Sequence, residues 1–430
     1  MAEVTVGIDI GTTSVKGVVA DDAGNVLART RLAHHLRAPS PDCFEHDATE
    51  AWSENVRAVW REMATGRDVL GVTVAAMVPS LCAVDDDGRP ISPGLLYGDA
   101  RGRLAGHADQ GDFGGFLHSL AATHPDAGGY WPAQAVANAA LCGRGAIGTQ
   151  TAMTATPVFS DGRWDAELCS ALGADVLQLP DLVPGLDAIG WVDGAMVSGG
   201  AIDAFAEQVV AGASEVGDVL VICGTTLITW LVTDGWPEVD GLWTVPHSEP
   251  GKTLIGGASN AGGLFLDRVR RMTAPVAPHE LDELDPGDLP VWLPYLRGER
   301  TPFHDPGRRA SLLDLHVGHG PAAIVQAAYE ASGFVARHHM ELSGVTARRI
   351  VAVGGGTRVE PWMQALADVT GLPVDVSAVP EGAALGAAYM ARVTAGLEAD
   401  TSGAKRWART DRRVSPRPGW VGAVDGRFKL

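Results

Sequence analysis

The stretch VTVGIDIGTTSVKGVVA, residues 4–20, decides the fold, because two apolar segments flank a Gly-Thr-Thr turn. The same plan returns as VLVICGTTLITWLV at residues 219–232, and a third apolar segment, 350–353, runs into the glycines 354–356. β-rich runs of this length around a glycine turn predict antiparallel strand pairs. Two similar halves indicate a duplicated α/β fold with its ligand site between the halves.

The Gly-Thr-Thr turns are suited to bind phosphate. A glycine lets backbone N–H groups approach an anion without a Cβ in the way, and the threonine hydroxyls add donors. Asp9 lies two residues before Gly11, so both positions share a face of the strand, and its carboxylate would tolerate phosphates only with Mg²⁺ between them. Lys16 is a further candidate for phosphate contact, and a solvated side chain is the equal alternative. One such hairpin is usually only a turn, so the repetition is what favours a nucleotide site. No P-loop sequence is present, and no GxGxxG follows the first strand.

Composition excludes several classes of function. The chain has 430 residues, 46% of them apolar, and a formal net charge of −19, which disfavours sequence-independent binding to nucleic acid. Five scattered cysteines without a CxxC pair argue against a disulfide framework or structural zinc site and favour a reducing compartment. Neither a signal-peptide pattern nor an apolar run of about 18 residues is visible, so we expect a cytoplasmic protein without a membrane segment.

Periodicity predicts further elements. Apolar residues recur at helical spacing from residue 48 to 63 and over 322–340 and 361–369, while 383–393 is a helix of small residues able to pack closely. A strand is expected at 69–77. Residues 104–150 carry little periodicity, and no element is assigned there. The basic stretch 401–430 predicts a poorly ordered, solvated tail.

The motifs, taken in order, resemble those of the FGGY carbohydrate kinases of the actin-like ATPase superfamily. The first is DIGTTSVKGVVAD, the first phosphate motif. The others are FEHDATEAWSENV, SLCAVDDDGRPISPGLLYGDARG, SDGRWDAELCSALG, SGGAIDAFAEQVVAG, CGTT, PYLRGERTPFHDPGRRASLLDL, VAVGGGTRVEPWMQALADVTGLPV and EGAALGAAY. The resemblance covers most of the chain. It implies an α/β fold of two ribonuclease H-like domains with a ligand cleft between them.

The resemblance also implies a role for each site residue. Asp203 would be the general base that accepts the proton of a sugar hydroxyl as it attacks ATP, and Asp9 and Asp203 would hold Mg²⁺. The phosphates and adenosine of ATP would be bound by Gly11, Thr12, Thr13, Lys16, Gly224, Thr225, Thr226, Gly355, Gly356 and Gln364. The sugar would contact Met77, Tyr97, Asp99 and Asp203, although Met77 could equally be plain core. Arg101 is left open between a substrate contact and a structural ion pair.

The expected organisation is an N-terminal domain at 1–194, a C-terminal domain at 195–397 and a basic tail at 398–430. Departures concern the sugar side. Val78 stands where xylulokinases usually have His, and glycerol kinases carry an Arg-Glu pair where this sequence has Ala76-Met77-Val78-Pro79. The family's first signature is degraded around residues 129–134. A pentulose such as xylulose is the favoured substrate. The alternative is a nucleotide-binding pseudokinase or regulatory protein without turnover. The resemblance implies that the partner is a small sugar or polyol. The oligomeric state stays open, with a homodimer as one candidate.

Overall fold

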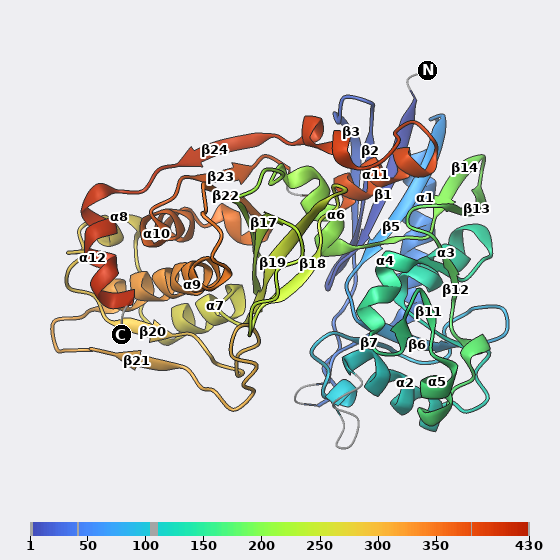
Figure 1. Cartoon of the computed structure of the whole chain (residues 1–430), viewed down its shortest axis with the longest axis horizontal. Coiled ribbons are helices and arrows are strands. Elements are labelled where there is room, and N and C mark those ends of the chain that lie inside the picture. The colour runs from blue at the N-terminus through green and yellow to red at the C-terminus, as the bar shows by residue number, and fades with distance from the viewer. Residues whose placement is uncertain (1–2, 41–42, 104–110, 380, 429–430) are drawn as a thin grey trace. The chain divides into compact units, whose positions relative to one another are not determined.

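The computed structural model describes residues 3–40, 43–103, 111–379 and 381–428, and the chain divides into two units (Figure 1). Unit 1 comprises Met1–Val210 and Glu381–Trp407, and unit 2 comprises Ala211–Pro380 and Ala408–Leu430. These bounds differ from the expected domain limits at 194 and 397. The difference arises because a segment late in the sequence returns to unit 1 and the segment after it belongs to unit 2.

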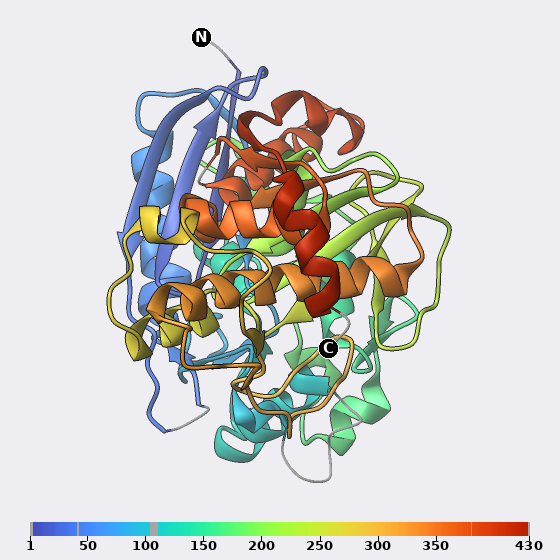
Figure 2. The same ribbon diagram turned by 90° about the vertical axis from the view of Figure 1, so that its left-hand side faces the viewer.

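Unit 1 is built on a mixed sheet in the order β13-β14-β5-β1-β2-β3, with β15 also paired to β5. Its strands are β1 (Val4–Ile10), β2 (Ser14–Ala20), β3 (Val26–Ala33), β5 (Val69–Ala76), β13 (Ala188–Val192), β14 (Ala195–Ser198) and β15 (Ala201–Ile202). β1, β2 and β3 are antiparallel neighbours, whereas β1–β5 and β5–β14 are parallel. Figure 2 shows the three blue N-terminal strands side by side. The predicted first hairpin is confirmed residue for residue.

Helices α1 (Asn55–Ala64), preceded by a π-helical turn at Thr49–Glu54, α3 (Ala133–Cys142) and α11 (Gly382–Thr394) cover this sheet. A fourth helix, α6 (Asp203–Ala211), lies against α11, where Ala206 faces Gly386. α1 buries Val56, Val59, Trp60 and Met63 against β1, β2 and β3, as the apolar spacing predicts. The described part of 104–150, the region without an assignment from the sequence, contains α2 (Gly111–Thr123), α3, the start of α4 (Thr149–Ala152), β8 (Gly129–Trp131) and β9 (Ala146–Gly148). The other short elements of unit 1 are β4 (Glu45–His46), β6 (Ser80–Val84), β7 (Gly94–Leu96), β10 (Phe159–Ser160), β11 (Arg163–Trp164), α5 (Ala166–Ala171) and β12 (Asp181–Val183).

α11 approaches its neighbours more closely than a helix with larger side chains could. A Cβ on Gly386 would lie 1.7 Å from the carbonyl oxygen of Ala206, and one on Gly7 would lie 1.8 Å from that of Ala384. Thr5 donates its hydroxyl to the carbonyl of Ala388 at 2.7 Å. The small residues of this helix therefore act as the sequence predicts.

Unit 2 repeats the plan. Its sheet runs β18-β19-β17-β16-β22-β23-β24, with strands β16 (Asp218–Cys223), β17 (Leu227–Asp234), β18 (Trp243–Pro246), β19 (Lys252–Ser259), β22 (Arg349–Val353), β23 (Val374–Ser377) and β24 (Thr410–Val414). β16 is antiparallel to β17 and parallel to β22, as β1 is antiparallel to β2 and parallel to β5. A short pair, β20 (Val291–Leu293) and β21 (Ser311–Leu313), stands apart. The two sheets share one strand plan, which is that of the predicted duplication.

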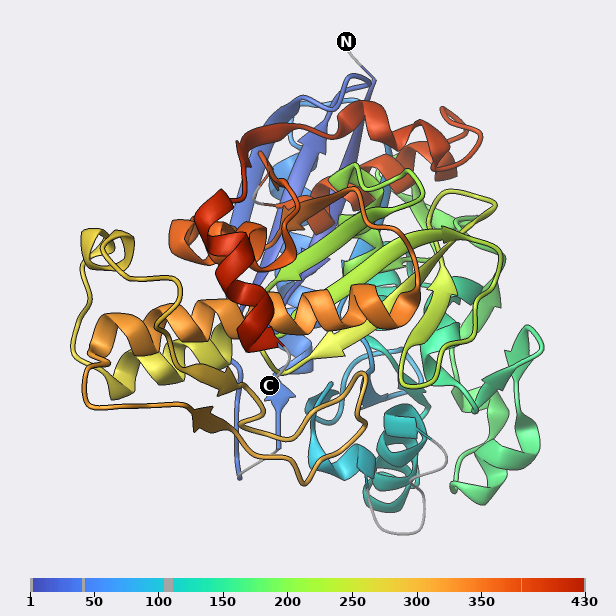
Figure 3. The ribbon, with the colours of Figure 1, turned by 60° about the vertical axis from the view of Figure 1, so that its left-hand side comes forward.

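The helices of unit 2 are α7 (Gly263–Met272), α8 (Pro278–Asp282), α9 (Pro321–Ser343), α10 (Glu360–Thr370) and α12 (Pro418–Phe428). Figure 3 shows α9 and α7 lying along one another beside the strands of unit 2. The expectation of a poorly ordered tail is wrong for the described part of 401–430. This part forms a 3₁₀ helix (Ser402–Trp407), β24 and α12, and α12 packs against α10. No helix within the described ranges has the length and apolar character needed to cross a membrane.

Candidate active site

Two aspartates lie at the same edge of the sheet in unit 1. Asp9 is the next-to-last residue of β1 and is paired with Ala75 of β5, while Asp203 directly follows β15, whose Ile202 is paired with Ala76. β1 and β15 therefore flank β5 on its two sides. Two strand spacings of ~4.8 Å separate them by about 10 Å. Both carboxylates thus stand at the carboxyl end of parallel strands, the usual place for a ligand in an open α/β sheet.

Asp9 is held by Lys16. The two residues are directly opposite each other in the β1–β2 pair, and Lys16 Nζ lies 3.0 Å from Asp9 Oδ2. The Asp9 side chain is only 5% exposed, against 30% for Lys16. The neighbouring Asp9 carboxylate raises the pKa of the Lys16 ammonium above its usual value. Lys16 therefore neutralises a carboxylate that would otherwise be buried and unpaired.

The carboxyl group of Asp203 has a pKa close to neutral pH. Burial, followed by the negative charge of Asp9, raises the pKa of the Asp203 carboxyl to about 6. The backbone N–H of Ala204 donates to Asp203 Oδ1 at 2.7 Å, and this bond and the Lys16 charge oppose the shift. A carboxylate with this pKa is largely ionised at pH 7 and has more affinity for a proton than an ordinary aspartate has.

A third acid, Glu207, was missed by the sequence analysis. It lies four residues after Asp203 on α6, hence on the same face of the helix. Burial and the charge of Asp9 raise the pKa of the Glu207 carboxyl to about 7. The signal that could have found it is this i, i+4 spacing from the aspartate of the motif.

The first Gly-Thr-Thr turn is held by its surroundings. Gly11 N–H donates to the Ser14 carbonyl at 3.0 Å, and the hydroxyls of Thr12 and Tyr97 are 3.1 Å apart. The Thr12 carbonyl lies 2.9 Å from Nε2 of His46, whose Nδ1 accepts a hydrogen bond from the indole of Trp52 at 3.1 Å.

The tautomer of His46 follows from these two contacts. Nδ1 is an acceptor, so the ring proton is on Nε2 and is donated to Thr12. Burial lowers the pKa of His46 to about 4, which keeps the ring neutral. Tyr97 and His46 thus fix the turn through neutral hydrogen bonds.

Asp99 and Met77, both expected to contact the sugar, are buried side chains in this structure. Asp99 is fully buried, and its two oxygens accept from the backbone N–H groups of Phe44 and Arg101 and from the Arg101 guanidinium at 2.6–2.9 Å. Arg101 also binds Glu45 at 2.6 Å and is 28% exposed. Met77 is 2% exposed and belongs to the core of unit 1. The ion-pair alternative for Arg101 therefore describes its contacts in this structure.

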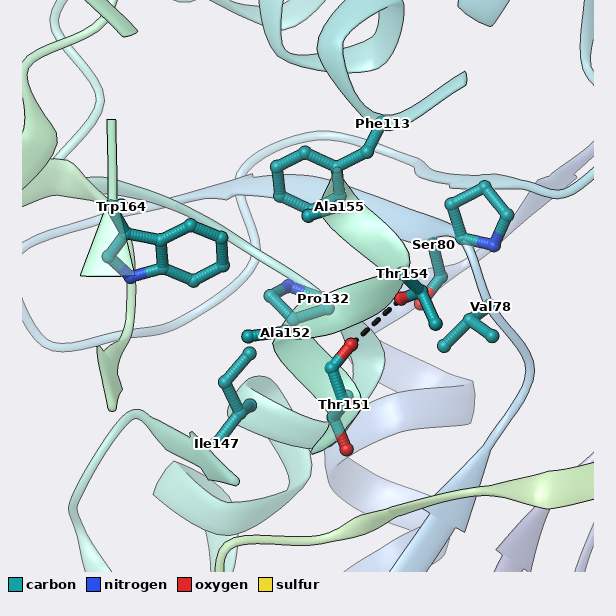
Figure 4. Close-up of a pocket in the computed structure, with 11 residues that line it drawn as sticks. Val78, Ser80, Phe113, Pro132, Ile147, Thr151, Ala152, Thr154, Ala155 and Trp164 are labelled. Atoms are coloured by element: carbon teal, nitrogen blue, oxygen red, sulfur yellow. Dashed lines mark hydrogen bonds between the residues drawn. The ribbon is translucent and has the colours of Figure 1, made fainter. Parts of the chain in front are cut away.

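A small pocket lies next to this region (Figure 4), lined by Val78, Pro79, Ser80, Phe113, Pro132, Ile147, Thr151, Ala152, Thr154, Ala155 and Trp164. Its wall is largely apolar. Ser80 Oγ accepts from the Ala133 N–H at 3.1 Å, and the Thr154 hydroxyl donates to the Thr151 carbonyl at 2.8 Å. These two hydroxyls are engaged by the chain itself, and Val78, the departure from the xylulokinase pattern noted from the sequence, adds a methyl surface.

In unit 2 the second Gly-Thr-Thr turn meets the triple glycine. A Cβ on Gly356 would lie 2.8 Å from the carbonyl oxygen of Cys223, the residue before Gly224, whereas a Cβ on Gly355 would meet open space. The first residue of α7 also contacts this turn, because Gly263 N–H donates to the Gly224 carbonyl at 2.9 Å. Gly355 therefore leaves its backbone open beside a phosphate-type turn and a helix N-terminus, a favourable setting for an anionic nucleotide.

The hydrogen bonds of Gln364 do not connect it to the second Gly-Thr-Thr turn or to the triple glycine. Its amide nitrogen donates to Asp368 Oδ1 at 2.9 Å and to the Ser415 carbonyl at 3.0 Å, which ties α10 to the chain between β24 and α12. This contact gives Gln364 a structural partner.

Comparisons with known proteins identify the family to which the chain belongs. The sequence models described as "FGGY family of carbohydrate kinases" match residues 4–106 for the N-terminal domain and 219–395 for the C-terminal domain. The xylulose kinase of Klebsiella pneumoniae is 26% identical, with 93% of this chain and 91% of that protein covered. The xylulose kinase of Escherichia coli (strain K12) is also 26% identical, with 91% and 90% covered.

Solved structures share the two-domain actin-like ATPase fold. The xylulose kinase from Rhodospirillum rubrum has a TM-score of 0.83 at 24% identity, with 99% of this chain and 97% of that chain covered. The gluconate kinase from Lactobacillus acidophilus has a TM-score of 0.87 at 19% identity, with 100% and 97% covered. Both domain models and relatives of nearly full length agree. The chain therefore belongs to the FGGY family of carbohydrate kinases and is a sugar kinase of the xylulokinase-like kind.

Proposed function

We propose that the protein transfers the γ-phosphoryl group of ATP to a hydroxyl of a pentulose such as xylulose, with Asp203 as the general base. The xylulose kinases among its relatives support the substrate class. The observation that carries the mechanism is the position of Asp9 and Asp203 at one edge of the sheet, on either side of β5. A base and a cation ligand about two strands apart leave room for the reacting groups.

In this mechanism Asp203 accepts a hydrogen bond from the attacking hydroxyl. As the new oxygen–phosphorus bond forms, the bond from phosphorus to the ADP oxygen breaks and the hydroxyl proton passes to the Asp203 carboxylate. A pKa of about 6 suits this step, because the group is ionised at pH 7 and still a competent proton acceptor. Positioning and charge stabilisation supply most of the remaining acceleration.

The cation would be Mg²⁺, held by Asp9 and Asp203. Carboxylate oxygens are the ligands that this hard ion prefers, and the Asp9 carboxylate, 5% exposed and paired with Lys16, is such a ligand. The ion would neutralise the phosphates of ATP. Gly11, Thr12, Thr13 and Lys16 would bind the transferring phosphate, Gly224, Thr225 and Thr226 the other phosphates, and Gly355 and Gly356 the adenosine.

For the sugar, we propose a direct contact with the Tyr97 hydroxyl and an indirect contribution from Asp99. Asp99 is buried and orients the guanidinium of Arg101 by an ion pair. Arg101 is partly exposed, so its guanidinium would be the group that contacts the sugar. Met77 would form the apolar floor beside Asp203. Because the pocket next to Val78 has an apolar wall, we expect sugar recognition to depend on few polar groups of the first domain.

The test is ADP release by the purified chain with Mg-ATP across xylulose, ribulose, glycerol and gluconate, with the product identified by mass and NMR. We expect a ketopentose to give the highest kcat/KM. Asp203→Asn should lower kcat at least about 100-fold with native circular dichroism. Asp86→Asn, an exposed aspartate in a turn, is the matched control and should retain activity. Near-wild-type turnover of the Asp203 variant would remove it from the base role, and release unaffected by every sugar would refute the substrate class.

A further inference from the structure

A buried amide side chain links the two strands of unit 1 that end at the candidate site. Gln134 lies in the first turn of α3 and is fully buried. Its Nε2 donates to the carbonyl of Ala76, the last residue of β5, at 3.0 Å and to the carbonyl of Ala201, the first residue of β15, at 3.1 Å. Because both neighbours are acceptors, this end of the amide is its NH₂ group. Gln134 therefore bridges β5 and β15.

The bridged strands determine where the two acids of the site lie. Asp9 is paired with Ala75 of β5, next to the first acceptor of Gln134, and Asp203 lies two residues after the second acceptor. Within the described ranges, β15 has two residues and pairs only with β5, in parallel. A parallel pair is slightly less stable per residue than an antiparallel one. The position of Asp203 thus depends on a short contact that Gln134 reinforces.

The chain is irregular just before β15. Three residues separate the last pair of β14 with β5 from the first pair of β15 with β5, whereas only two residues of β5 lie between the same pairs. An extra residue of this kind disrupts the hydrogen bonds of the ladder locally. Gly200, in this segment, has a φ of +82°, and a Cβ there would lie 3.1 Å from the Cβ of Gln134. Gln134 therefore packs against the irregular segment as well as bonding to the strand that follows it.

Packing alone does not require a glutamine at this position. Its Oε1 is buried and has no hydrogen-bond partner among the described residues, which costs free energy. An apolar side chain would avoid that cost but could not bridge two carbonyl groups. We propose that Gln134 is a positioning residue that fixes Asp203 beside β5 through its two hydrogen bonds, an inference that rests on the proposed function.

The experiment compares two buried amides of one helix. Asn138 lies one turn after Gln134, is fully buried and has an unpaired Oδ1 within the described part of the chain, but it donates to Ala146 of β9 at 2.8 Å. With xylulose and Mg-ATP, Gln134→Met should lower kcat about tenfold to 100-fold and leave KM within threefold, because a misplaced reacting group is costly. Asn138→Leu is the matched control and should keep kcat within twofold. Equal losses of kcat in the two variants would overturn the proposal.

A double-mutant cycle separates positioning from a general loss of structure. If Gln134 acts through Asp203, Gln134→Met should change kcat by less than twofold in an Asp203→Asn background. An equal loss in both backgrounds, or no loss in the wild type, refutes the positioning role. Near-wild-type turnover of Asp203→Asn alone refutes the base role instead, so the two hypotheses fail in different measurements.

Hydrogen exchange followed by mass spectrometry tests the positioning without turnover. The backbone amides of 201–204 should exchange at least about threefold faster in Gln134→Met than in the wild type, since β15 opens locally more easily without the two bonds. Asn138→Leu should leave exchange at 201–204 unchanged. Wild-type exchange at 201–204 in the Gln134 variant contradicts the proposal. If Gln134→Met does not fold, Gln134→Leu, which also lacks donors, is measured in its place.

Discussion

Asp203 has a pKa raised to about 6 by burial and by the negative charge of Asp9. Because the ionised form accepts the proton, kcat/KM should fall about tenfold per pH unit below pH 6 and be level above it, until other groups titrate. A pH–rate profile with xylulose between pH 4.5 and 8 measures this. Lys16→Met removes a charge that holds this pKa down, so its profile should shift to higher pH. A midpoint near 4 would contradict the environment described for Asp203.

The raised pKa of Asp203 also lowers the stability of the folded chain at neutral and higher pH. The folded chain binds a proton at Asp203 more tightly than the unfolded chain, whose carboxyl has a pKa of about 3.8. Stability from this group is therefore fully present below pH ~4 and lost as the pH rises through about 6. We expect Asp203→Asn to raise Tm by a few °C at pH 8 and to leave it nearly unchanged at pH 4. Calorimetry at the two pH values checks this, with Asp86→Asn as control; an equal change at both pH values would contradict it.

Single residues also show where sequence reasoning ended. Asp9 and Lys16 were singled out because a strand and a turn fix their spacing, whereas Asp203 was singled out by the resemblance of its segment to a family motif. The burial of Asp99 could not be read from its motif alone, because Arg101 lies two residues away in the motif but Phe44 approaches from another segment. Glu207 has no motif of its own. Its i, i+4 spacing from Asp203 is the signal that the sequence offered, because this spacing places two residues on one face of a helix.

Among the elements, α11 depends most on the absence of side chains. Gly386→Ala would place a methyl 1.7 Å from the Ala206 carbonyl, and backbone atoms cannot yield as side chains do. We expect the variant to lose at least about 2 kcal/mol of stability, although alanine has the higher helix propensity. Chemical denaturation measures the loss. Gly422→Ala in α12 meets open space and should be neutral or slightly stabilising. Equal effects of the two changes would refute close packing as the cause.

Element prediction succeeded where the local pattern and the fold agree. β1 and β2 begin and end where expected, since apolar runs meet at a glycine turn. The region from α2 to α4 could not be assigned, because short helices rich in small residues have weak periodicity. β24 failed for another reason: its sequence, TDRRV, is polar, and it becomes a strand through pairing with β23 and the bonds of Arg413 to Asp375 at 2.6 and 2.8 Å.

At the scale of the whole molecule, each unit is completed by a segment distant in sequence. α11 joins unit 1 after the chain has built most of unit 2, and β24 and α12 then return to unit 2. The returning segment supplies cations to buried acids. Arg417 binds Asp368 at 2.8 Å, and Arg427 binds Glu330 at 2.7 Å, with both acids fully buried. A basic composition that suggested a solvated tail therefore serves internal ion pairs.

Loss of one partner from such a pair should cost about 3–5 kcal/mol, because the remaining charge stays buried and unpaired. Arg427→Met retains most of the volume of the side chain but leaves Glu330 alone, so we expect Tm to fall by at least about 6 °C at pH 7. Differential scanning calorimetry measures the fall. Arg427→Met combined with Glu330→Gln removes both charges and should recover most of it. Protease digestion should cut unit 2 of the single variant first, since both residues belong to that unit. An unchanged Tm, or a loss equal in the single and double variants, would show that the C-terminal segment contributes packing alone.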